Sequence, residues 1–183
     1  STWQKVIVSA DKDFIQLLDD KTILHRPIQK EYLNKNGVVE KFGIHPTNFA
    51  LARAIVGDAS DNLPGVPRVG MDTVAKRFSF LKQEKTYYLN DVIAECNKPE
   101  NTQKVFSNII ENKELIEENY DIMQLSSPML SIQAKQGIDD TFEHYKPHYN
   151  QTEIRKLMLQ DGVLTVNTTD LEQRFNHIIT SFS

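Results

Sequence analysis

The 183-residue chain has a single cysteine, Cys96, and no apolar run long enough to cross a membrane. One cysteine excludes an internal disulfide and a thiolate metal cluster, and it fits a reducing compartment. The sequence also shows no signal peptide. We therefore expect a soluble cytoplasmic protein that has no membrane partner.

An excess of positive charge is missing too. The chain has 21 lysines and arginines against 25 aspartates and glutamates, a formal net charge of −4. Proteins that bind nucleic acids usually carry a basic surface. Between Arg68 and Lys85, however, five basic residues stand against two acidic ones, a local net charge of +3. Because attraction to phosphate is screened over roughly 8 Å, a local patch of this kind can suffice.

The most informative stretch of the chain runs from Gly57 to Phe78 and reads GDASDNLPGVPRVGMDTVAKRF. Asp58 and Asp61 are three residues apart and follow an apolar segment that has helical spacing. Two carboxylates about 4 Å apart repel by about 4 kcal/mol at an effective dielectric of about 20, so they take up a proton or a cation. The pair is a candidate cation site, and the alternative is two solvated carboxylates.

A turn rich in glycine and proline, residues 64–70, follows these aspartates and leads into a helix expected over residues 71–81. Prolines fix φ, and glycines allow backbone that other residues avoid. Backbone N–H groups at such a turn bind anions, and a phosphodiester is the expected one. Lys76 and Arg77 lie on the polar face of the expected helix. The alternative is an ordinary helix-turn-helix that does not bind nucleic acid.

Asp11 and Asp13 form a second acidic pair, directly after an apolar run at residues 5–9 that is typical of a buried parallel strand. In open α/β sheets, sites are built at this end of a strand. In the alternative interpretation, Asp11 caps the next helix and Asp13 complements its dipole.

The remaining pattern is mostly helical. We expect a short strand at residues 22–24 and helices over the ranges 38–42, 46–56, 87–96, 103–115, 153–160 and from 169 onward. His45 is interpreted as a helix-start residue. The acidic run from Glu111 to Asp121 is interpreted as a solvated helix face. The aromatic residues Phe142, Tyr145 and Tyr149 are expected to pack inside the protein.

The order SADKD, then GDASDN, then PGVP and a glycine before a basic helix resembles the 5′-nucleases, the flap endonucleases and 5′-3′ exonucleases of replication. Tailed-phage RNase H and 5′-exonuclease proteins are the most similar in character. The resemblance implies an α/β fold in which a mainly parallel sheet with flanking helices precedes a helix-three-turn-helix and a mostly helical carboxyl-terminal region. The expected divisions are residues 1–45, 46–85 and 86–183.

The resemblance also implies a site that holds two divalent ions, Mg²⁺ or Mn²⁺, which suits oxygen ligands without histidine or cysteine. Asp11 would belong mainly to the first ion, and Asp13, Asp58 and Asp61 would form the second. A K⁺ ion is expected on the carbonyl oxygens of the Gly65–Gly70 turn. The implied DNA-binding residues are Gly65, Val66, Pro67, Arg68, Val69, Gly70, Thr73, Lys76 and Arg77.

The chain departs from the family at Arg68, where glycine is frequent, and at Asp72, where lysine is frequent. The resemblance covers the carboxyl-terminal half of a family member, so we expect a fragment that is weakly active or inactive without the other half. The expected substrate is duplex DNA with a 5′ end or flap, or an RNA–DNA hybrid. The expected setting is a monomer in a bacterial or phage-infected cell, with a single-stranded DNA-binding protein as a possible partner. Two other functions stay open: a DNA-binding module without catalysis, and a docking domain of a replication protein.

Overall fold

A computed structural model describes residues 3–127, 130–146, 148–163 and 165–181. The chain divides into two compact units, residues 1–128 and residues 129–183. All residues predicted to form the site belong to the first unit. The functional boundaries expected at residues 45 and 85 stay predictions.

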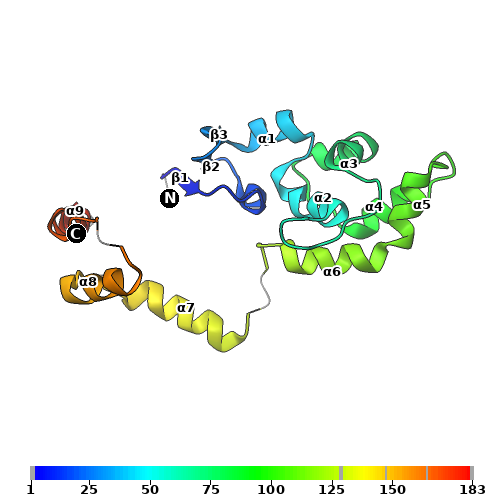
Figure 1. The fold of residues 1–183 in the computed structure, drawn as a ribbon. Helices are drawn as coiled ribbons and strands as arrows, with labels where there is room; N and C mark the ends of the chain where they lie inside the picture. Colours follow the sequence, from blue (N-terminus) through cyan, green and yellow to red (C-terminus); the bar gives the residue numbers. More distant parts are fainter. Residues whose placement is uncertain (1–2, 128–129, 147, 164, 182–183) are drawn as a thin grey trace. The chain divides into compact units, whose positions relative to one another are not determined.

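The first unit contains a three-stranded sheet with the order β1-β2-β3, made of Lys5–Val8, Thr22–Arg26 and Glu31–Leu33 (Figure 1). β1 pairs with β2 in parallel, whereas β2 pairs with β3 antiparallel. A tight turn joins the antiparallel pair, and Lys30 in this turn has a φ of 51°. The sheet is therefore small and mixed. The expectation of a mainly parallel sheet is wrong for the described strands, because β2 returns at once through a hairpin turn instead of a crossover helix.

β1 is an edge strand, and its valines face solvent. Val6 is 49% exposed and Val8 is 64% exposed. The expectation of a buried strand is wrong here. Among the described residues β1 pairs with a strand on one side, and an apolar sequence does not by itself bring other elements onto the strand. The buried apolar side chains of the sheet come from β2, where Leu24 is completely buried, and from β3, where Leu33 is 4% exposed.

Short helices connect the sheet to the rest of the unit. The 3₁₀ helix η1 (Asp13–Leu17) follows β1 and buries Ile15 completely. Helix α1 (Lys35–Phe42) begins after Asn34, whose side chain accepts a hydrogen bond from the Gly37 N–H. A second 3₁₀ helix, η2 (Pro46–Asn48), begins after His45, whose ring accepts the Thr47 N–H. The interpretation of His45 as a helix-start residue is confirmed.

Helix α2 (Phe49–Val56) is the centre of the unit, and it packs against α3 (Met71–Arg77) and α6 (Lys113–Met123). Phe49, Ala52 and Ile55 on α2 are almost completely buried. The helix expected over 71–81 ends at Arg77 and continues as the 3₁₀ helix η3 (Ser79–Lys82). Helices α4 (Leu89–Cys96) and α5 (Lys104–Glu111) complete the unit (Figure 1).

The second unit contains α7 (Ile132–His144), α8 (Gln151–Gln160) and α9 (Thr168–Ser181). Helices α8 and α9 agree with the expected ones and pack together, and the ring of Tyr149 lies 5.6 Å from that of Phe175. Helix α7 was not expected, since Gly137 interrupts a weak pattern. Phe142 is 86% exposed and Tyr145 is 64% exposed, so the expected packing is wrong for both. Across the described residues of the chain, every helix is too short or too polar to cross a membrane.

Candidate functional site

Two glycines, Gly57 and Gly65, allow two segments of backbone to pass in close contact where α2 ends; this contact is called the glycine crossing. Gly57 has a φ of 77°, and a Cβ atom built on Gly65 would lie 1.8 Å from the Val56 carbonyl oxygen. Between the two glycines, Asp58 and Leu63 exchange backbone N–H···O bonds of 2.8 Å each. A residue with a Cβ atom would clash with backbone at either glycine position, so the crossing fixes where Asp58 follows the helix.

Two asparagine side chains, from α5 and α6, donate hydrogen bonds to backbone carbonyls of the loop. The buried Asn119 of α6 donates to the Ala54 carbonyl oxygen at 3.0 Å and to the Pro64 carbonyl oxygen at 2.8 Å. Asn108 of α5 donates to the Pro67 carbonyl oxygen at 3.2 Å. Sequence reasoning missed both residues, because asparagines inside helical patterns give no local signal for a partner more than forty residues away.

An acidic cavity of about 360 Å³ lies between the end of β1 and this loop. Its lining residues are Ala10, Asp11, Lys12, Arg53, Asp58, Ser60 and Asp61. Three of the four predicted acidic residues thus line one cavity, although Asp11 and Asp58 are 47 positions apart in the sequence. Asp13 is not among the lining residues, but it is joined to this group through Arg53.

Arg53 is the central side chain of the site, and sequence reasoning missed it. Its Nε donates to Asp13 Oδ1 at 3.2 Å, and its Nη2 donates to Asp58 Oδ2. The Arg53 side chain is 10% exposed, and those of Asp13 and Asp58 are 18% and 16% exposed. An arginine within the apolar helix sequence FALARAIV was the available signal, because a buried arginine is almost always paired.

The carboxylates also accept local hydrogen bonds. Asp11 Oδ1 accepts the Asp13 N–H at 2.8 Å, but the N-cap of η1 is Lys12, so the interpretation of Asp11 as the helix cap is wrong. Asp58 Oδ1 accepts the Ser60 N–H at 2.9 Å and the Ser60 hydroxyl at 2.6 Å. Asp61 is exposed at the rim of the cavity. These bonds orient Asp58 firmly and leave Asp61 the most accessible of the predicted acids on the loop.

The two carboxylates bound by Arg53 differ in pKa. The bond from Ser60, together with Arg53, lowers the pKa of Asp58 to about 2. Burial raises the pKa of Asp13, against the opposing attraction of Arg53. Both anions in turn raise the pKa of Arg53 against the effect of its burial. At neutral pH the arrangement is therefore a cation shared by two carboxylates.

The donor types suit Mg²⁺ or Mn²⁺, because carboxylate and hydroxyl oxygens from Asp11, Asp58, Ser60 and Asp61 surround one cavity. Within the described ranges, however, no three His, Cys, Asp or Glu side chains are placed as a ready metal centre. The side of the site between Asp13 and Asp58 is bridged by the Arg53 guanidinium. Metal binding by the four predicted aspartates stays a prediction.

The predicted DNA-binding residues fall into two groups. Val66 and Val69 are buried, so they anchor the loop in the core and have their backbone alone to offer a ligand. Thr73 is half-buried, and Gly65 packs against the backbone of Val56 and Gly57, so these two residues also belong to the less accessible group. The accessible members are Pro67, Arg68, Gly70, Lys76 and Arg77.

Two of the accessible basic residues have notable geometry. Arg68 has a φ of 64°, a left-handed conformation that favours glycine, and glycine is the residue frequent here in the family resemblance. The Arg77 guanidinium lies over the Phe106 ring, 6.0 Å from its centroid. This contact holds the charged end of the Arg77 side chain against α5, while the residue stays exposed.

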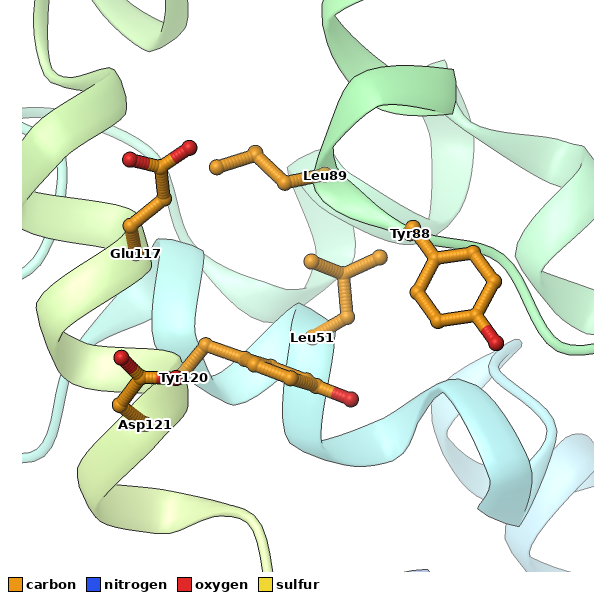
Figure 2. Close-up of a pocket in the computed structure, with 6 residues that line it drawn as sticks. All are labelled: Leu51, Tyr88, Leu89, Glu117, Tyr120 and Asp121. Carbon is orange, nitrogen blue, oxygen red and sulfur yellow. The ribbon is translucent and has the colours of Figure 1, made fainter.

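A second cavity, of about 310 Å³, contains none of the predicted site residues. Figure 2 shows its lining side chains, which come from α2, α6 and the start of α4: Leu51, Tyr88, Leu89, Glu117, Tyr120 and Asp121. Glu117 and Asp121 are exposed, which agrees with the interpretation of the acidic run as a solvated helix face.

No family model matches the chain. A 5′-3′ exonuclease of Buchnera aphidicola (subsp. Schizaphis graminum) is 42% identical over 82 residues, 43% of this chain and 29% of the relative. The thermostable DNA polymerase I of Thermus thermophilus is 27% identical over 161 residues, 86% of this chain and 18% of the relative. The chain thus spans less than a third of the length of either protein.

Solved structures with a similar fold include 5′-nucleases as well. The T5 5′-exonuclease with bound zinc has a TM-score of 0.56 and 22% identity, covering 66% of this chain and 42% of that one. A T5 flap endonuclease complex with DNA and metal ions has a TM-score of 0.55 and 21% identity, with the same coverage. These structures support the fold, and the sequence relatives support the kinship. The resemblance noted in the sequence is confirmed: the chain is similar in sequence to 5′-3′ exonucleases and DNA polymerase I, and in fold to the T5 5′-exonuclease.

Proposed function

We propose that the chain is part of a metal-dependent 5′-3′ exonuclease or flap endonuclease that hydrolyses phosphodiesters at DNA 5′ ends. One observation carries the proposal. Asp11, Asp58 and Asp61 line a single cavity, and the chain runs from that cavity directly into a rigid loop followed by a basic helix. A phosphate backbone held by the loop would therefore lie close to clustered carboxylates.

The DNA-binding part of the proposal rests on the loop and α3. Lys76, Arg77 and Arg68 are accessible cations, and the glycine crossing and the two asparagines fix the backbone between them. Contacts of this kind reach phosphates and not base edges, so binding is independent of base sequence. A K⁺ ion fits the same loop, because the carbonyls of Val66 and Pro67 each accept one hydrogen bond and have a second lone pair.

The catalytic part assigns roles to this chain's own residues. Asp11, Asp58 and Asp61 present the oxygens that would hold Mg²⁺ or Mn²⁺, and Ser60 keeps Asp58 ionised and oriented. When bound, a pair of such ions supplies an activated water and stabilises the leaving oxygen. The relatives are longer than this chain, so we propose that further ligands come from the rest of the nuclease. The exposed Val6 and Val8 of β1 offer a surface for that part.

A second candidate function, a DNA-binding module without catalysis, is favoured by Arg53. This residue pairs with Asp13 and Asp58 without any metal and offsets one of their two negative charges. The two candidates share the DNA-binding loop and differ in whether the cavity takes part in chemistry.

A cleavage assay on an end-labelled flap duplex separates them. The chain alone should be nearly inert in Mg²⁺, whereas the chain supplemented with the missing half of a family member should release short 5′ products. Asp11→Asn and Asp58→Asn should abolish this release, and Asp140→Asn, on exposed α7, is the matched control. Absence of cleavage by the supplemented wild type would favour the binding module. Strong chelator-sensitive cleavage by the chain alone would contradict the incomplete site.

A further inference from the structure

We propose that Arg53 is the resident counter-ion of Asp13 and Asp58, and that a divalent ion gains these two carboxylates only by displacing the Arg53 guanidinium. The inference rests on the proposed function, since it concerns how that site takes up its metal. It assigns to Arg53 control over metal affinity, a role that differs from holding the fold together.

The first support is that one cation serves two anions from separate segments. Asp13 opens η1 after the strand β1, Asp58 follows α2, and Arg53 on α2 donates to both. All three side chains are less than one-fifth exposed. Partly buried carboxylates in this position repel each other unless a cation lies between them. The protein supplies that cation itself, so part of the negative charge of the site is offset before any metal arrives.

The second support is that the guanidinium and a metal ion exclude each other. The guanidinium nitrogens occupy hydrogen-bonding positions on both carboxylates, and Mg²⁺ or Mn²⁺ needs those oxygens at about 2.1 Å. Two cations that share one carboxylate also repel strongly where water is largely excluded. The Arg53 side chain lies on the wall of the acidic cavity, so it can swing toward solvent when a metal replaces it.

The third support is the contrast with another bridged pair in the same unit. Lys35 Nζ lies 2.6 Å from Asp20 and 3.3 Å from Glu84, so it too joins two carboxylates. Those carboxylates are 77% and 71% exposed, far more than Asp13 and Asp58. Glu84 lines a cavity with Lys35 and Glu40, but Asp20 is not among its lining residues. Removing the Lys35 charge alters the net charge of the protein by the same amount, but the two carboxylates it leaves are already well solvated.

The test is Mn²⁺ titration by calorimetry on the full chain without DNA. Arg53→Met, which removes the charge and keeps most of the side-chain volume, should bind Mn²⁺ at least tenfold more tightly than wild type. Lys35→Met should bind as wild type does, and Arg53→Met combined with Asp58→Asn should lose the gain. Arg53→Met should melt roughly 5 °C or more below wild type in chelator, and Mn²⁺ should restore much of this loss.

A second measurement follows the wild-type protein, and a variant serves only to assign the signal. In wild type, Mg²⁺ should shift the Arg53 Nε–H resonance, assigned by its absence in Arg53→Lys, as the bond to Asp13 is lost. Equal Mn²⁺ affinity in wild type and Arg53→Met, with an unmoved Arg53 resonance, would overturn the inference and leave the proposed function standing. Absence of binding by every variant would overturn the inference and also remove the metal basis of the proposed function.

Discussion

The backbones of Gly57 and Gly65 touch where the chain leaves α2. A Cβ atom on Gly57 would lie 2.3 Å from the Gly65 nitrogen, and one on Gly65 would lie 1.8 Å from the Val56 oxygen. This contact joins the acidic cavity to the loop proposed to bind DNA, because Asp58 follows Gly57 and Val66 follows Gly65.

Gly65→Ala should destabilise the first unit by about 3 kcal/mol or more, since its methyl group meets backbone that cannot move aside. Gly70→Ser is the matched control. A Cβ atom on Gly70 meets nothing within 4 Å, and serine is a good helix N-cap, so this change should be within about 0.5 kcal/mol of wild type. Urea unfolding measures both. Equal stabilities for the two variants would contradict the crossing.

Asp58 should make the metal-free chain sensitive to acid. Its pKa falls from 3.8 to about 2 on folding, so its ionised form stabilises the fold above pH 4, and this stabilisation is lost as the pH falls through 2. Asp58→Asn should therefore cost about 2 kcal/mol at pH 7 and progressively less toward pH 2. Ser60→Ala should show part of the same pattern. Urea unfolding at several pH values checks this, and a cost that did not change with pH would refute it.

DNA affinity should depend on Lys76 and Arg77 through charge. Replacing both by glutamine should reduce the slope of log K against log salt by roughly two, if each cation displaces about one counterion. The control is Lys5→Gln with Lys41→Gln, which removes two lysines that are paired with Asp19 and Glu31. Binding should be equal for two duplexes of the same length and different sequence. Fluorescence anisotropy at several salt concentrations measures these quantities, and an unchanged slope would exclude the loop as the binding surface.

Arg68 should show a conflict between backbone and charge. Its left-handed φ costs a non-glycine residue about 1 to 2 kcal/mol, and glycine's freedom in the unfolded chain returns about 0.4 to 1 kcal/mol of that. Arg68→Gly should therefore be more stable than Arg68→Ala by about 1 kcal/mol. Both variants lose the same charge, so both should bind DNA more weakly than wild type and to the same extent. If alanine were as stable as glycine, the strain at Arg68 would be disproved.

The local elements were largely predictable because short-range patterns set them. Pro46 and Gly57 bound the expected helix that contains α2, and the helices α8 and α9 followed from apolar spacing. The helix expected over residues 38–42 begins three residues earlier, at Lys35, because Asn34 caps it. β3 and α7 were not predicted. β3 forms only because a hairpin turn brings it beside β2, and α7 has too weak a pattern to be recognised.

The sequence by itself determined the family and the acidic residues, because GDASDN and the glycine-rich turn carry their chemistry in adjacent positions. Tertiary structure decided which cation pairs with Asp13 and Asp58. Arg53 reaches Asp13 across forty positions, and Asn119 reaches Pro64 across fifty-five. No local pattern encodes such pairs, since they depend on how α2 packs against the end of β1 and against α6. The structure also left β1 exposed, because burial depends on neighbours and not on the apolar content of the strand.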